Sequence, residues 1–93
     1  MNRSKKELTA AIGAGRYEAR ARATRGLREA QLRLSAARAA VAQARCELLR
    51  LQQAGKDSAK AQEAFELATK QARDAERGVQ LADNALAGIK SGL

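Results

Sequence analysis

Six arginines fall within eighteen residues in the first half of the chain, at Arg16, Arg20, Arg22, Arg25, Arg28 and Arg33. A guanidinium group stays charged and presents a planar fork of N–H donors, which can hold a phosphate or a carboxylate through two hydrogen bonds. On a helix, Arg22, Arg25 and Arg28 would share part of one outward face, with the other three beside it. The cluster predicts an anionic partner, either nucleic acid or an acidic protein surface. A solvated helix face that only keeps the protein in solution is the remaining interpretation.

The charge is divided unevenly between the two halves of the chain. Residues 1–53 contain twelve basic and four acidic residues, whereas residues 54–93 contain six of each, so the whole net charge of +8 lies in the first half. Such a division indicates that one element of the fold carries a cationic surface and another does not. Tyr17 is the single aromatic residue among the arginines, so a platform for stacking several bases is not predicted.

No pattern in the chain predicts catalysis. There is no histidine, and Cys46 therefore lacks a base that could activate its thiol. The segment Gly13-Ala14-Gly15 lacks the third glycine and the preceding strand of a dinucleotide-binding loop. We therefore expect a protein that is not an enzyme and has no cofactor or metal, with Cys46 as an incidental surface thiol.

The composition favours long, thinly packed helices. Most apolar residues are alanine, the large ones are mainly eleven leucines, and proline is absent. No apolar stretch is long enough to span a membrane, and no apolar run of signal-peptide type follows the basic N-terminus. We expect a cytoplasmic protein with no membrane partner, of bacterial, plasmid or phage type by its richness in arginine and alanine.

Apolar residues recur at heptad spacing in both halves, which is typical of a coiled-coil seam. In the first half the a positions are Leu27, Leu34, Val41 and Leu48, and the d positions are Ala30, Ala37, Ala44 and Leu51. In the second half the a positions are Phe65, Ala72, Val79, Leu86 and Leu93, and the d positions are Ala61, Ala68, Ala75, Ala82 and Ile89.

A short segment between the halves predicts a turn. Gly55 can end a helix in the left-handed conformation, and Asp57 or Ser58 can cap the next helix. So short a connection makes the helices antiparallel neighbours, although one continuous helix that dimerises is the alternative. Pairing large residues with alanine across the seam gives partners whose numbers add up to 109. This register brings Arg38 towards Glu76 and Arg33 towards Gly78, where the glycine would leave room for the arginine stem.

The predicted organisation is all-α, an antiparallel two-helix hairpin with an alanine-rich seam and a short N-terminal helix. Residues 1–15 form the short helix and a glycine hinge, because Ser4 to Glu7 match a capping box and Gly13-Ala14-Gly15 should break the helix. Residues 16–93 form the hairpin, with a helix over 16–54, a turn over 55–57 and a helix over 58–90.

A second candidate surface is apolar and lies off the seam. On one side of the second helix it comprises Ala64, Leu67, Gly78, Leu81 and Ala85. Leu8 and Ile12 of the N-terminal helix are candidates to pack there, as are a second copy of the chain or a partner helix. Because a lone two-helix hairpin is only marginally stable, we expect a homodimer or a subunit of a larger complex.

These features predict a small basic helical protein that binds nucleic-acid phosphates through its arginine-rich half, as an accessory protein of a bacterium, plasmid or phage. In architecture alone the fold resembles the small dimeric hairpin RNA-binding proteins of plasmids. The alternative is a protein–protein adaptor or inhibitor, such as a secretion-stalk hairpin or a phage protein that blocks a host complex. Basic hairpins of the flagellar-export stalk type have a similar composition but are longer.

Overall fold

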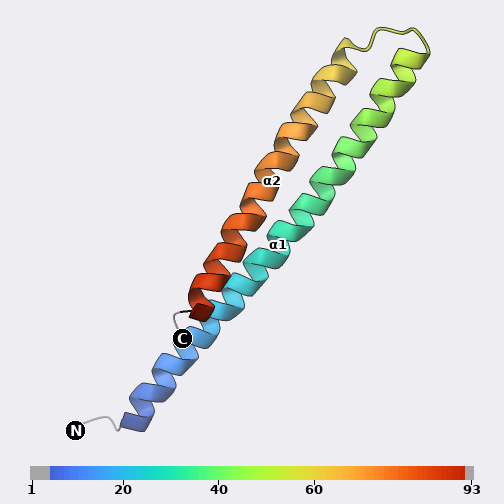
Figure 1. Cartoon of the computed structure of the whole chain (residues 1–93). Helices are drawn as coiled ribbons and strands as arrows, with labels where there is room; N and C mark the ends of the chain where they lie inside the picture. The colour runs from blue at the N-terminus through green and yellow to red at the C-terminus, as the bar shows by residue number, and fades with distance from the viewer. Residues whose placement is uncertain (1–4, 92–93) are drawn as a thin grey trace.

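The computed structural model is a hairpin of two long helices, α1 (Lys5–Gln53) and α2 (Ala59–Ser91). The structure describes the backbone of residues 5–91 and the side chains of residues 15–89. The helices run antiparallel and form a rod that measures 81 × 15 × 15 Å (Figure 1). This architecture confirms the predicted all-α hairpin and excludes a single continuous helix, because the chain reverses direction between α1 and α2.

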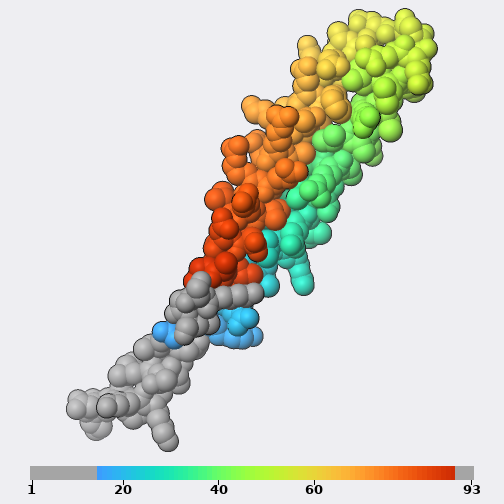
Figure 2. Space-filling view, in the orientation of Figure 1, coloured from blue at the N-terminus to red at the C-terminus, as the bar shows by residue number. Residues whose placement is uncertain are grey.

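The seam between the helices lies where the heptads place it. Every a and d position from Leu27 to Leu51 and from Ala61 to Ile89 is buried or half-buried. Even the most buried of the described side chains, Ala30, Leu48, Ala68 and Leu86, keep 7–9 % of their surface exposed. The core is therefore a single thin layer between two helices, which lie side by side along most of the rod (Figure 2).

The turn is built by hydrogen bonds that the local sequence predicts. Gly55 has a φ of 67°, and its N–H donates to the carbonyl of Gln52 over 3.1 Å. The N–H of Lys56 donates to the carbonyl of Leu51 over 3.0 Å, which completes a Schellman motif at the end of α1. Asp57 Oδ1 then accepts the N–H of Ala59 over 3.1 Å at the start of α2. Because these bonds satisfy free backbone groups, the reversal is fixed locally.

The predicted break at the start of the chain is wrong. Helix α1 runs without interruption through Gly13-Ala14-Gly15, so a separate short helix followed by a hinge is not found. A glycine inside a helix costs only about 1 kcal/mol relative to alanine, and the neighbouring residues are good helix formers. As a result α1 has 49 residues against 33 in α2, and its N-terminal part projects past the end of α2 (Figure 1).

The register follows from one ion pair and one shared hollow. Arg38 Nη2 of α1 lies 3.6 Å from Glu76 Oε1 of α2, as predicted. Arg33 and Gly78 line the same hollow between the helices. The predicted reason for Gly78 is wrong, however, because a Cβ atom at this position would meet no heavy atom within 4 Å. The Arg33 stem does not occupy that space.

None of the helical segments that the structure describes combines the length and the apolar character needed to cross a membrane.

Candidate nucleic-acid interface

All six clustered arginines are exposed along the N-terminal half of α1. Within the described residues no carboxylate forms an ion pair with any of them, whereas Arg38 pairs with Glu76 and Arg50 pairs with Glu47. Residues 15–33 contain these six arginines against two glutamates, which leaves a net charge of +4 on this stretch. The cluster is therefore a dense array of cations that the fold itself does not neutralise.

The structure separates Arg33 from the rest of the cluster. Arg33 lines a hollow between the two helices, opposite Asp74 and Gly78 of α2. By their heptad positions, Arg22, Arg25 and Arg28 face away from the seam, and the three are exposed as expected. These three form the outward cationic face, whereas Arg33 belongs to the groove between the helices.

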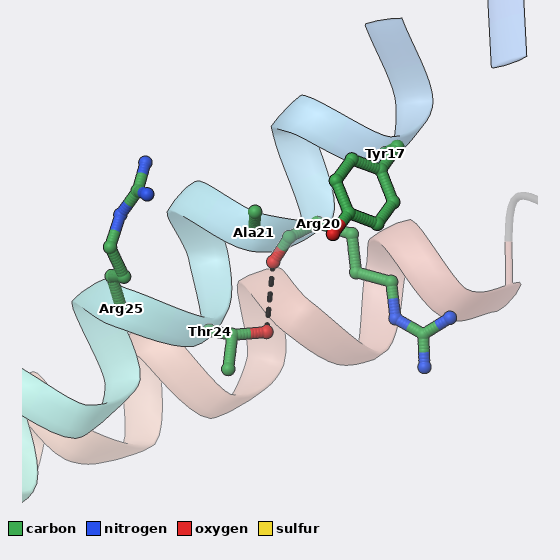
Figure 3. A pocket seen from close by; sticks show the side chains of 5 residues that line it. All are labelled: Tyr17, Arg20, Ala21, Thr24 and Arg25. Carbon is green, nitrogen blue, oxygen red and sulfur yellow. Dashed lines mark hydrogen bonds between the residues drawn. The ribbon is translucent and has the colours of Figure 1, made fainter. Parts of the chain in front are cut away.

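A shallow hollow of about 330 Å³ lies beside the arginines on the surface of α1. Ala21 lies between the ring of Tyr17 and the side chain of Arg25, and Arg20 extends in a different direction from Arg25 (Figure 3). The hydroxyl of Thr24 is not available as a free donor there, because it donates to the carbonyl of Arg20 over 2.8 Å. Tyr17 is 75 % exposed, so its ring is open to solvent.

The other end of α1 holds a contrasting arrangement of charge. Glu47 and Arg50 form a bidentate pair, with Arg50 Nη2 2.6 Å from Glu47 Oε1 and Arg50 Nε 3.0 Å from Glu47 Oε2. These hydrogen bonds lower the pKa of the Glu47 carboxyl and raise the pKa of the Arg50 guanidinium. An arginine that is paired in this way is less free to bind an external anion than the arginines of the N-terminal cluster.

The candidate apolar surface of α2 is largely open to solvent. Leu67 and Leu81 are 57 % and 65 % exposed, Ala64 and Ala85 are exposed, and Gly78 is half-buried. The side chains of Leu8 and Ile12 lie outside the described residues, so their predicted packing on this surface stays a prediction.

The described residues bring together no group of three His, Cys, Asp or Glu side chains that could hold a metal ion. Cys46 is exposed on α1, on the side away from the seam.

Two residues near these surfaces are not among the predicted site residues. Tyr17 is a lone aromatic residue in the sequence, and its position one turn from Arg20 and Ala21 is the signal that places it beside the hollow. Asp74 is inconspicuous in the sequence because it is one of five acidic residues in an electroneutral helix. Its signal is positional, since it lies seven residues from both Leu67 and Leu81.

Comparison with models of protein families, with characterised protein sequences and with solved structures yields no match for this chain.

Proposed function

We propose that this protein is a non-enzymatic binding module that engages nucleic-acid phosphates through the arginine-rich part of α1. The observation that carries the proposal is the set of exposed arginines in residues 15–33, none of which has an ion-pair partner among the described residues. Permanent cations of this kind bind phosphates and release the counterions that were condensed on them.

The length of the cationic stretch suits a polyanion. From Arg16 to Arg28 the helix rises about 18 Å at 1.5 Å per residue. Duplex DNA carries one charge per about 1.7 Å of its axis, so a helix of this length passes several phosphates. A compact anion would occupy only one or two of the arginines. An extended partner therefore explains the extended array better than a small ligand does.

The position of the arginines in the rod also favours this function. They lie towards the end where α1 continues past α2, so fewer groups of the hairpin surround them there (Figure 1). The part of α2 that lies level with them, residues 76–91, contains two acidic and two basic residues, which gives a net charge of zero. The opposite helix therefore does not cancel the positive charge of this end.

The experiment that tests the proposal compares the salt dependence of DNA binding between two triple variants. In one variant Arg22, Arg25 and Arg28 become glutamine, and in the matched control Lys60, Lys70 and Arg73 become glutamine. Both variants remove three positive charges and keep good helix formers. We expect the slope of log K against log salt to flatten by about 0.9 for each phosphate that the first variant no longer neutralises, and much less in the control. Equal flattening in both variants would show that net charge, and not this face, determines binding.

A second candidate function is a protein–protein adaptor or inhibitor. It is favoured by Leu32 and Leu49, which are 65 % and 43 % exposed on α1 outside the seam. The same arginine fork also fits a carboxylate on an acidic protein. A protein that binds no nucleic acid near physiological salt would favour this candidate.

A further inference from the structure

One face of the hairpin contains a hollow that no side chain among residues 15–89 fills. Its volume is about 370 Å³, and its floor is made of small residues from both helices, namely Ala30, Ala37, Ala75 and Gly78. A Cβ atom added at Gly78 would meet no heavy atom within 4 Å. The space above this glycine is therefore open in the single chain.

Two leucines extend this face along α2. Leu67 and Leu81 lie seven residues before and after Asp74, which itself lines the hollow. Residues seven apart lie on the same side of a helix after two turns. Both leucines are more than half exposed, so the hollow lies between two large apolar side chains that the described residues do not cover.

The residues of this face are arranged symmetrically about Asp74. Leu67 and Leu81 lie seven residues on either side, Gln71 and Gly78 lie three and four residues away, and Ala64 and Ala85 lie ten and eleven residues away. In a two-fold interface residue i contacts residue j and residue j contacts residue i. Leu67 matches Leu81 in kind and Ala64 matches Ala85, whereas Gln71 corresponds to Gly78, which leaves room for a larger side chain. In an antiparallel pair of α2 helices, leucine would therefore meet leucine, and Gln71 of one copy would lie over the open space at Gly78 of the other.

The charges at the hollow are complementary in the same arrangement. Arg33 lies on the α1 side of the hollow and Asp74 on the α2 side. Neither forms an ion pair with any described residue of its own chain. If the α2 helix of a second copy lies along the hollow in the antiparallel direction, the two Asp74 carboxylates lie near the axis, and each also comes level with Arg33 of the other copy. The two Arg33 guanidinium groups then offset the repulsion between the carboxylates.

The direction of packing also follows from the distribution of charge. A parallel dimer would place two arginine-rich ends, each with a net charge of +4 over residues 15–33, side by side. An antiparallel dimer places them at opposite ends of the assembly. A second copy that covers this face would also stabilise the hairpin by burying apolar surface, because no described side chain is fully buried in the single chain.

We propose that the protein forms an antiparallel homodimer in which the α2 helices pack on each other across this hollow, with the two-fold axis near Asp74. Leu67 of one copy contacts Leu81 of the other, and Arg33 pairs reciprocally with Asp74. The dimer uses Arg33 and leaves the outward arginines Arg22, Arg25 and Arg28 exposed at both ends. It does not depend on what those arginines bind.

A charge-exchange experiment tests the reciprocal pair. Arg33→Asp alone places two acids together on each side of the two-fold axis, and Asp74→Arg alone places two bases together there. Sedimentation velocity of each variant should show mainly monomer. A mixture of the two variants should show dimer, because each heterodimer regains opposite charges at the interface. Failure of the mixture to associate while the wild-type chain dimerises would overturn the assignment of this pair.

Two further measurements fix the surface and the direction. Leu81→Gln should weaken dimerisation by about tenfold or more, because a buried leucine is removed from both copies. Leu32→Gln is the matched control, since Leu32 is equally exposed but lies on the outer side of α1. A wild-type chain that stays monomeric up to sub-millimolar concentration, or equal effects of the two variants, would overturn the proposal.

The single cysteine reports the direction of packing. Cys46 lies level with residue 63 of α2, eleven residues from Asp74, so the two cysteines of an antiparallel dimer lie about 33 Å apart along the axis. With a spin label on Cys46 of each copy, double electron–electron resonance should give a distance between the two labels near this value. In a parallel dimer the labels would lie level with each other, and a separation set by the width of the rod alone would contradict the antiparallel arrangement.

Discussion

Arg38 of α1 and Glu76 of α2 face each other across the hairpin, with Nη2 and Oε1 3.6 Å apart. Their side chains are 65 % and 56 % exposed, so solvent screens the pair and its contribution to stability is at most about 1 kcal/mol. The value of this contact lies in what it indicates about register. The contact is compatible with a register in which the residue numbers of seam partners add up to 109. This register determines which residues of α1 and α2 share each layer of the seam.

The register predicts which cysteine pairs can form. With Cys46 replaced by serine, Ala37→Cys and Ala72→Cys in one chain should oxidise to an intrachain disulfide, because both positions belong to one seam layer. Ala37→Cys combined with Ala61→Cys should not form an intrachain disulfide, since these two positions are separated by about 16 Å along the helix axis. Non-reducing gels at high dilution check the outcome, and bridges that form only between chains would contradict the hairpin.

The heptad phase predicts a contrast between two leucines on the same helix. Leu34 is half-buried in the seam and Leu32 is 65 % exposed. Leu34→Ala should lower the free energy of unfolding by about 2 kcal/mol or more, because alanine then faces alanine in that layer. Leu32→Ala should change it by less than about 0.5 kcal/mol. Urea unfolding followed by circular dichroism measures both, and similar decreases would show that the phase is wrong.

Replacing Gly26 or Gly55 by alanine should change the stability of the protein in opposite directions. A Cβ atom at Gly26 would meet nothing within 4 Å, so Gly26→Ala should stabilise the protein by about 1 kcal/mol through helix propensity. Gly55 has a φ of 67°, and an alanine there would be strained. Gly55→Ala should therefore lower the melting temperature, whereas Gly26→Ala should raise it. A stabilising effect at Gly55 would contradict the Schellman turn.

The Glu47 carboxyl provides a pH-dependent signal. Hydrogen bonds from Arg50 lower the pKa of Glu47 below its ordinary value of 4.5. A lowered folded-state pKa adds stability that is present above the unfolded-state pKa and is lost as the pH falls through the folded-state value. Because both side chains are more than half exposed and solvent screens the pair, the effect on stability should be small. An NMR titration should show the pKa of Glu47 rising in Arg50→Gln, and no change in that variant would contradict the pairing.

Much of this fold could be predicted because its determinants are local or periodic. The heptads identify the seam, Gly55 ends α1, and the sizes of residues such as Leu48 and Ala61 set the register. The break at Gly13-Ala14-Gly15 was predicted wrongly because glycine propensity alone does not outweigh good helix formers on both sides.

The site was harder to predict than the fold. The outward position of Arg22, Arg25 and Arg28 followed from their spacing, but the separation of Arg33 from this outward face depends on how α2 lies against α1. The open space at Gly78 and the position of Asp74 on the hollow also appear only when both helices are placed. These positions depend on how the two helices pack on each other, which the local helix propensity of each segment does not determine.

The most direct measurement of the central claim is a titration of the wild-type protein with duplex DNA, single-stranded DNA and RNA near physiological salt, followed by fluorescence anisotropy. The proposed function predicts saturable binding to at least one of them, with an affinity that falls steeply as salt increases. Tyr17→Ala should leave duplex binding almost unchanged, because phosphate contacts do not use the ring. Binding no tighter than high micromolar to all three nucleic acids would contradict the claim and favour an acidic protein partner.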